Sequence, residues 1–591
     1  MKDFFKSFFA TLLALVVVGG VVLFGFFGLL AVIGSSGKPT VPSKAVLVFD
    51  LDTSLVDGER DTEPGEALNE AFGGGGAHSQ SLPLAIEALD RAASDSRITG
   101  LFLTGNLQSA GPAQLRELRE AIQRFKAKKP VLAYNLGWTK RDYYLAAGAT
   151  TVFINPFGGM EVNGLASEPM FFGEAFKKYG VEVQVTRVGK YKSAVEPFIT
   201  DRMSEPNREQ IQKLLDDIWG EWKETVAKDR KKLPIDFQVI ADEKGLVEAE
   251  DALKAGLVDR IAPYDEVLDE LKKLAGKQAK DKEFPQITLA TYAGIPGDAK
   301  SGKTRIAVVV AEGEIVDGEG KSTQVGGERL SRELRRLRLD DRVKAVVLRV
   351  NSPGGSASAS ELIQREVVLT KKVKPLVVSM GHLAASGGYW ISTYGDRIFA
   401  EPTTITGSIG VFGLLPNVKK LANEHGITWD SVQTAKLANP MTLTRPKNEV
   451  ELTRIQGVVD HIYEQFIAKV ADSRKMKKEA VHEIAQGRVW SGTEAQKLGL
   501  VDEIGGLGAA LRHAAKMAKA ENDFYVVGPE HEPDAFKELL KSIGQGKPRK
   551  LAKTGPVEAL TEAFKMQLER LSALNDPKGI YARLPFEIDL K

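Results

Sequence analysis

Residues 211–230 read IQKLLDDIWGEWKETVAKDR, and residues 455–474 read IQGVVDHIYEQFIAKVADSR, so the two segments match at an offset of 244 residues. Three more pairs match in the same order, at offsets of 243 to 246: ITGLFLTGN (98–106) with VKAVVLRVN (343–351), YYLAAGATTVFINP (143–156) with YWISTYGDRIFAEP (389–402), and AGLVDRI (255–261) with LGLVDEI (498–504). Matches in one order at a nearly constant offset indicate an internal duplication.

Apolar strands and amphipathic helices alternate within each copy. AVLVFDL (45–51), IAVVVAEGEIV (306–316) and AVVLRV (345–350) have the apolar runs of buried strands, and SRELRRLRLDD (331–341) has helical periodicity. This alternation predicts an α/β fold with mainly parallel strands. We place the domains, in chain order, as a first copy at 44–285, a linker at 286–303, a second copy at 304–530 and a tail without a first-copy partner at 531–591.

Composition narrows the possible functions of the 591-residue chain. Its content of 43% hydrophobic and 27% charged residues is typical of globular domains, and its formal charge of +2 argues against a nucleic-acid-binding surface. The absence of cysteine excludes disulfides, thiol catalysis and thiolate metal sites. The seven histidines show no metal-ligand spacing and no carboxylate cluster is evident, so we expect neither a metal nor a cofactor.

One N-terminal segment predicts the compartment. Residues 8–34 form a run of 27 without a charge, whereas a membrane-spanning helix needs about 20 and a secretory apolar region usually has about 7–15. We therefore predict a single transmembrane helix within residues 1–43, with a cleaved signal peptide as the alternative. Lys2 and Lys6 precede the apolar run, so the short N-terminus should stay in the cytoplasm while the rest of the chain is exported.

The two copies differ where a nucleophile would lie. HLAASGGYW (382–390) carries Ser386 followed by two glycines, while the first copy holds at those positions Lys140, Arg141 and Asp142. Likewise NSPGGSASASEL (351–362) follows a strand of the second copy, and its counterpart NLQSAGPAQL (106–115) lacks the Pro-Gly-Gly turn. Only the second copy therefore has a candidate serine nucleophile.

The lysines differ in the opposite direction. RVGKYKSAVEPF (187–198) contains Lys190 and Lys192, and the second copy has QTAKLANPMTLT (433–444) in its place. Lys436 matches Lys190, but Ala438 stands at the position of Lys192. Because one copy has the candidate nucleophile and the other has the lysine, we predict one complete site per chain, made from both copies.

A serine and a lysine together permit nucleophilic catalysis. A serine hydroxyl needs an adjacent base, and a lysine becomes one when burial lowers the pKa of its amine. We predict Ser386 as the nucleophile and Lys192 as its base, with Ser408 in TGSIG (406–410) accepting a hydrogen bond from the lysine. Backbone N–H groups after the serine and in the Pro-Gly-Gly turn can serve as oxyanion donors.

These segments closely resemble a known family, signal peptide peptidase A in its long form. The resemblance rests on NSPGG (351–355), AASGGYWIS (384–392), TGSIG (406–410) and VGKYKSAVEPF (188–198), together with the anchor and the duplication. It implies that the copies have a fold similar to the Clp protease and crotonase superfamily, built from repeated β-β-α units. It also implies a bowl-shaped homotetramer.

The resemblance assigns a role to each candidate site residue. Ser386 is the expected nucleophile, Lys192 the general base and Ser408 the hydroxyl that orients the lysine. The expected oxyanion donors are Gly387, Gly354 and Gly355.

The activity implied by the resemblance is that of a serine endopeptidase in the bacterial inner (cytoplasmic) membrane, with its catalytic region on the periplasmic side. Its expected partners are cleaved signal peptides and other extended apolar peptides, bound as a strand beside Gly354–Gly355.

Three alternatives stay open. A crotonase-like enzyme acting on acyl-CoA would share the glycine turn but would need neither Ser386 nor Lys192. A non-catalytic membrane scaffold would tolerate degenerate catalytic positions in both copies, whereas the set in the second copy is intact. His382, four residues before the serine, is the alternative base, although such short spacing makes the geometry awkward.

Overall fold

The computed structural model describes residues 40–58, 79–230, 236–295, 302–521, 523–528, 576 and 580–584. The predicted membrane anchor at 8–34 and most of the predicted tail lie outside these residues. None of the helices that the structure describes is long and apolar enough to cross a membrane. The described helices and strands belong to one compact unit, made of Pro42–Arg60, His78–Glu530 and Gly555–Lys591.

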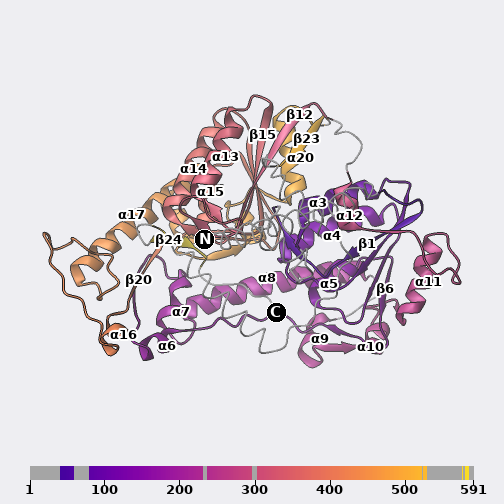
Figure 1. Ribbon diagram of the computed structural model, residues 1–591, viewed down its shortest axis with the longest axis horizontal. Coiled ribbons are helices and arrows are strands. Elements are labelled where there is room, and N and C mark those ends of the chain that lie inside the picture. Colours follow the sequence, from indigo (N-terminus) through magenta and orange to yellow (C-terminus); the bar gives the residue numbers. More distant parts are fainter. Residues whose placement is uncertain are drawn as a thin grey trace, which may run out of the picture. The chain divides into compact units, whose positions relative to one another are not determined.

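The two copies build two sheets that share a series of six strands in the same order, and the second sheet has two further strands, β19 (Ile405–Gly407) and β21 (Val489–Ser491). Figure 1 shows both sheets. The first sheet runs β10 (Arg260–Ile261), β6 (Thr151–Ile154), β5 (Val131–Asn135), β4 (Ile98–Thr104), β1 (Ala45–Asp50) and β11 (Gln286–Thr288). The second runs β22 (Glu503–Ile504), β18 (Arg397–Ala400), β17 (Leu376–Ala385), β15 (Val343–Ser352), β12 (Thr304–Glu312) and β23 (Phe524–Val527). Neighbouring strands in both series are parallel, which confirms the predicted α/β fold and its duplication.

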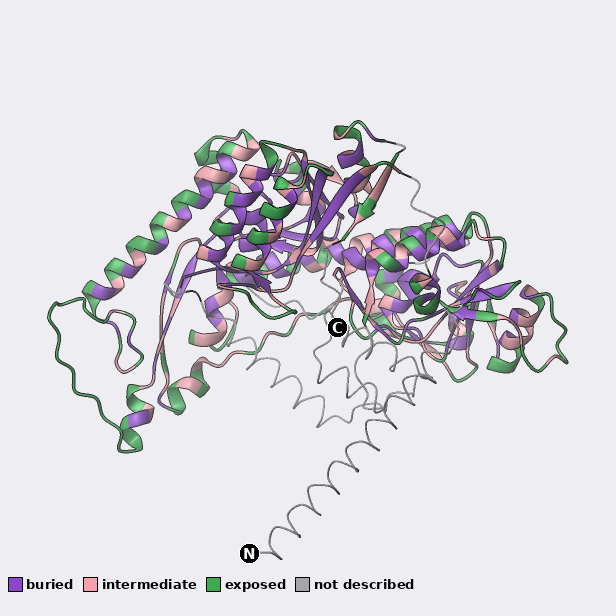
Figure 2. Cartoon of the chain, turned by 45° about the horizontal axis from the view of Figure 1, so that its top comes forward, coloured by how far each residue is buried: buried purple, intermediate pink, exposed green. Residues whose placement is uncertain are grey.

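The helices repeat in the same way. The matched pairs are α3 (Leu82–Ala92) with α13 (Gly327–Leu339), α4 (Pro112–Lys126) with α14 (Ala357–Lys371), α5 (Lys140–Ala146) with α15 (Gly387–Ser392), α8 (Glu205–Asp229) with α17 (Glu449–Arg474), α9 (Phe237–Glu243) with α18 (Lys478–Ile484), α10 (Ala249–Lys254) with α19 (Gly492–Lys497), and α11 (Tyr264–Leu274) with α20 (Leu507–Met517). Because side chains alternate along a strand, β15 packs Val346 and Leu348 against the cluster containing α13 and α14, and Val347 against α20. The sheet is therefore buried on both faces, as Figure 2 shows by colour.

A smaller sheet combines strands from three regions of the chain. Its order is β14 (Val325–Gly326), β13 (Ile315–Val316), β16 (Gly354–Ser356), β24 (Ile580–Arg583), β20 (Phe412–Asn417) and β8 (Glu182–Arg187). β8 comes from the first copy and pairs antiparallel with β20 of the second over six residue pairs, from Arg187 with Phe412 to Glu182 with Asn417. The segment that follows β8 is thereby carried to the second copy.

The remaining elements are short and connect or edge the sheets. They are β2 (Ser54–Val56), β3 (Ser79–Ser81), β7 (Gly159–Glu161), α6 (Gly173–Lys178), a 3₁₀ turn (Ser193–Val195), α7 (Glu196–Ile199), β9 (Leu246–Glu248), α12 (Leu289–Gly294), β19 (Ile405–Gly407), α16 (Lys419–Glu424) and β21 (Val489–Ser491). The segment predicted as a linker thus begins with β11, an edge strand of the first sheet, and α12. The segment predicted as a tail contributes β24. Strands this short show no periodicity in the sequence.

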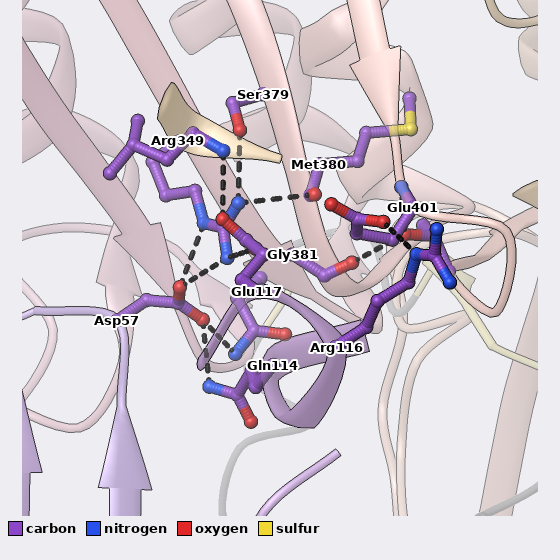
Figure 3. Close-up of polar contacts among 12 residues, drawn as sticks. Asp57, Gln114, Arg116, Glu117, Arg349, Ser379, Met380, Gly381 and Glu401 are labelled. Carbon is purple, nitrogen blue, oxygen red and sulfur yellow. Dashed lines mark hydrogen bonds and ion pairs between the residues drawn. The ribbon is translucent and has the colours of Figure 1, made fainter. Parts of the chain in front are cut away.

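A buried charged network joins the first copy to strands of the second sheet (Figure 3). The fully buried guanidinium of Arg349 on β15 donates to Asp57 at 2.7 Å and to Glu117 of α4 at 2.6 Å. It also donates to the hydroxyl of Ser379 on β17 at 2.9 Å. A buried cation is stable only where its donors are satisfied, so these two first-copy carboxylates fix the register of one copy on the other.

Candidate active site

Ser386 lies in the sharp turn between β17 and α15. Its φ of 55° is in the left-handed region, and its N–H donates to the carbonyl of Gly407 on β19 at 2.8 Å. A non-glycine residue held in this region stores strain, which is common at functional turns. The following turn needs glycine because a Cβ at Gly388 would come within 2.6 Å of the carbonyl oxygen of Ser352. The sequence SGG therefore lets β15 approach the nucleophile's turn closely.

Lys192 reaches the same place from the first copy through β8. The chain turns after β8 at Gly189, whose φ is 98° and where a Cβ would overlap the backbone of Gln486. The backbone of Lys192 then lies against Gly487, where a Cβ would come within 2.7 Å of the backbone nitrogen of Lys192. These two contacts place the lysine side chain inside the second copy. Lys190, in contrast, is exposed and lies 5.0 Å from the ring centre of Tyr191.

The amine and two hydroxyls meet in a fully buried cluster. Lys192 Nζ lies 2.8 Å from Ser386 Oγ and 3.0 Å from Ser408 Oγ, and all three residues have no exposed surface. Lys192 Nζ also donates to the carbonyl of Ser408 at 3.2 Å. Burial holds the pKa of the Lys192 amine well below its ordinary value, because a charged ammonium would lose its hydration there. The amine is therefore shifted toward the neutral form that can accept a proton.

Two residues that the sequence analysis missed hold the lysine loop. The guanidinium of Arg488 lies 4.7 Å from the ring centre of Tyr191 and donates to its hydroxyl at 2.9 Å, while its backbone carbonyl accepts from the N–H of Ser408 at 2.7 Å. Gln210 of α8 donates to the carbonyl of Tyr191 at 3.1 Å. A signal was available, because Gly245 stands at the first-copy position of Arg488. That difference parallels the one that identified Lys192.

The predicted oxyanion glycines surround one carbonyl oxygen of β24. β24 pairs antiparallel with β16, with Arg583 opposite Gly354 and Ala582 opposite Gly355. A Cβ at Gly354 would lie 2.1 Å from the carbonyl oxygen of Ala582, and a Cβ at Gly387 would lie 2.9 Å from it. The position predicted for a substrate strand is therefore occupied by the C-terminal part of the chain itself.

His382 has a different environment. A Cβ at Gly111, which precedes α4, would overlap its ring, and burial lowers the pKa of the imidazole to about 4. The side-chain partners of Ser386 are Lys192 and, at 3.5 Å, the carbonyl of Gly410. The geometry thus favours the lysine as the base. Within the described residues, no group of three or more carboxylates and histidines could hold a metal ion.

A serine hydroxyl in contact with a desolvated amine can perform acyl transfer, which is the chemistry of serine hydrolases. Comparison with known proteins gives the class. The model of peptidase family S49 matches residues 123–278 and 369–521, one stretch in each copy. The chain belongs to this family and is a serine endopeptidase, which confirms the resemblance seen in the sequence.

Similar proteins match over most of the chain. Protease 4 of Salmonella typhi is 34% identical, covering 93% of this chain and 91% of the relative. Protease 4 of Haemophilus influenzae is 35% identical over 95% of each chain. The chloroplastic serine protease SPPA of Arabidopsis thaliana is 34% identical, covering 74% of this chain and 66% of the relative.

Among solved structures, a ClpP1 mutant from Listeria monocytogenes is 18% identical and covers 34% of this chain and 94% of its own, with a TM-score of 0.24. A score this low supports no argument, so the assignment to the Clp protease and crotonase superfamily stays a prediction.

Proposed function

We propose that the chain is a membrane-anchored endopeptidase that degrades cleaved signal peptides, with Ser386 as nucleophile and Lys192 as general base. The observation that carries this proposal is the 2.8 Å contact between the serine oxygen and the lysine nitrogen. It joins the two copies inside a pocket without exposed surface. Neither residue would be needed by an acyl-CoA enzyme or by a scaffold.

The proposed reaction has two steps. Ser386 Oγ attacks the carbonyl carbon of the substrate while Lys192 takes the hydroxyl proton, and the lysine then donates that proton to the leaving nitrogen as the peptide bond breaks. Water hydrolyses the resulting ester, again with the lysine as base. Ser408 holds the amine in place, and the N–H groups of Gly387 and of the turn at Gly354 and Gly355 stabilise the oxyanion.

The proposed substrate and location are supported by the apolar N-terminal run and by the strand position beside β16. The run at 8–34 would fix the enzyme in the bacterial inner membrane, with the site on the periplasmic side, where released signal peptides are near. A groove that binds backbone as an added strand suits peptides of varied sequence. We further propose a homotetramer, which sedimentation of the detergent-solubilised full chain would test.

Labelling and digestion test the proposal together. A phosphonylating serine reagent should label the full chain and fail to label Ser386→Ala. The unlabelled wild-type enzyme should cut synthetic signal peptides faster than acidic hydrophilic peptides of equal length, with the products measured by mass spectrometry. Labelling without signal-peptide cleavage would overturn the substrate and keep the nucleophile. A reporter fused after residue 45 that is active only in the cytoplasm would overturn the topology.

A further inference from the structure

β24 lies between β16 and β20, at the position predicted for a substrate strand. It pairs antiparallel with β16 on one side and with β20 on the other, and the N–H of Leu584 donates to the carbonyl of Pro353 at 2.7 Å. Ala582 is fully buried, and Ile580 and Tyr581 are at most 4% exposed. A strand hydrogen-bonded on both sides leaves its backbone no freedom to slide, so the register of β24 identifies subsites.

The register places one peptide bond of β24 beside the predicted oxyanion glycines. A Cβ added at Gly354 or at Gly387 would lie 2.1 or 2.9 Å from the carbonyl oxygen of Ala582, so this oxygen lies beside the two turns that carry the proposed oxyanion donors. A peptide in this register would be attacked at the carbonyl corresponding to Ala582. The residue corresponding to Arg583 would then follow the scissile bond.

The side chain after that bond meets a carboxylate. Arg583 Nη2 lies 2.6 Å from Glu314 Oε1, and the two side chains are each 17% exposed. Glu314 follows β12 and precedes β13, and its carbonyl accepts from the N–H of Val325 on β14 at 2.8 Å, so its backbone is held by the small sheet. At this burial a carboxylate loses much of its hydration, and an arginine compensates with a positive charge that a neutral residue cannot supply.

We propose that Glu314 is a specificity-determining residue that selects a basic side chain immediately after the scissile bond. The proposal rests on the proposed peptidase function and adds a preference to it. A glutamate at that position of a substrate would face Glu314 across a poorly hydrated contact and bind worse than glutamine. The chain's own C-terminal segment uses the same contact and competes with substrates for the groove.

Three quenched fluorescent peptides test the preference in the full chain. They share an apolar sequence with alanine before the scissile bond and differ only in the next residue, which is arginine, glutamine or glutamate. We expect kcat/KM to be about fivefold higher for arginine than for glutamine, the size expected of a partly exposed ion pair, and lowest for glutamate. Each ratio is measured on one enzyme preparation, so the fraction of active enzyme cancels.

Substitution of Glu314 sharpens the test. Glu314→Gln should bring the arginine-to-glutamine ratio to about one, and Glu314→Lys should reverse the preference toward glutamate. Glu319→Gln is the matched control, because Glu319 is exposed and pairs with Arg332 away from β24. Its ratios should equal those of the wild type.

The outcomes separate this proposal from the peptidase function. Equal cleavage of the three peptides by the wild type, or an unchanged ratio in Glu314→Gln, would overturn the role of Glu314 alone. No cleavage of any peptide, without labelling of Ser386, would overturn the peptidase function and this inference together.

Arg583→Glu should also speed the cleavage of all three peptides by weakening the hold of β24 on the groove. An unchanged rate would contradict the proposed competition.

Discussion

The two copies place different residues at one position of the same fold. By the offset of 246 residues that matches Tyr143 to Tyr389, Lys140 takes the place of Ser386. Its amine donates to Asn163 and has a pKa lowered by burial. The first copy therefore has a lysine amine at the position of the second copy's serine hydroxyl.

The position of the orienting hydroxyl differs as well. The N–H of Val162 donates to the carbonyl of Gly245, as the N–H of Ser408 does to the carbonyl of Arg488, so valine and serine are equivalent. A valine cannot accept a hydrogen bond from an amine. The first-copy pocket thus lacks both hydroxyls of the second.

The segment around Lys192 and its counterpart in the second copy also have opposite environments. In the first copy, residues 191–193 are buried in the second copy, while residues 423–439 of the second copy are exposed along their whole length (Figure 2). The exposed segment includes apolar side chains, with Val432 fully exposed and Ile427 at 56%. We propose that the first copy supplies the base and the second copy the nucleophile, and substitutions in the two copies test this division.

Removal of either partner should have the largest effect. Ser386→Ala and Lys192→Ala should each lower kcat/KM by roughly 10⁴-fold, and the double variant should be no worse, because the pair acts as one unit. Lys192→Arg should lower kcat/KM as much as Lys192→Ala, since a guanidinium cannot take a proton. Lys190→Ala is the control and should keep activity. A dead Lys190→Ala with an active Lys192→Ala would reverse the assignment.

Acid should inactivate the enzyme through Lys192. The neutral amine is the active form, so kcat/KM should fall about tenfold per pH unit below the lowered pKa of the lysine and level off above it. The position of this limb reports the pKa in the free enzyme. A limb near the ordinary lysine pKa of about 10.4 would contradict desolvation as the cause.

The same pKa shift predicts a cost in stability. Below about pH 10.4 the unfolded chain protonates Lys192, whereas the folded chain does so only below its lowered pKa. Between these two pKa values the unfolded state binds more protons than the folded state. The contribution of Lys192 to the free energy of unfolding therefore falls as pH decreases through this window, and it is constant below the lowered pKa. Lys192→Met should therefore unfold at a higher temperature than the wild type at pH 7, with the difference shrinking toward pH 10. Equal melting temperatures would count against a neutral buried lysine.

Loss of Arg349 should loosen the contact between the copies. Arg349→Ala leaves Asp57 and Glu117 buried without their cation, which should cost about 3–5 kcal/mol in the free energy of unfolding. The midpoint of urea unfolding, followed by circular dichroism, measures it. Arg332→Ala is the control: it removes the exposed ion pair with Glu319 and should change the free energy of unfolding by less than about 0.5 kcal/mol.

Arg488 should affect turnover more than binding. Arg488→Ala frees Tyr191 beside the base, so we expect kcat to fall about tenfold to a hundredfold with little change in KM. Arg488→Lys keeps a cation near the ring but loses the fork of donors and should recover only part of the rate. A change confined to KM would show that Arg488 contacts the substrate instead.

The smallest effect is expected from giving the first copy a serine. Lys140→Ser in the Ser386→Ala background should stay inactive, because the first copy has Val162 in place of the orienting hydroxyl and no lysine segment enters its pocket. Labelling by the phosphonylating reagent measures this directly. Labelling at residue 140 would show that the first copy retains a latent site.

Much of this organisation could be read from the sequence because it depends on local pattern and residue type. Apolar runs and helical periodicity repeat at one offset, so the duplicated α/β fold was predictable. Opposite loss of serine and lysine pointed to Ser386 and Lys192 before any geometry was known. Arg488 was missed because a lone arginine beside a turn has no distinctive pattern unless it is compared with Gly245.

Only the tertiary structure decided how these residues meet. β8 pairs with β20, and β24 with β16, through backbone hydrogen bonds that are the same for every residue type. No pattern of side chains therefore predicts this pairing. The ion pairs of Arg349 and Glu314 likewise join partners hundreds of residues apart, whose complementarity appears only when the chain is folded. The sequence by itself determined the elements and the chemistry that each copy carries. The long-range backbone pairing determined that Lys192 of one copy meets Ser386 of the other.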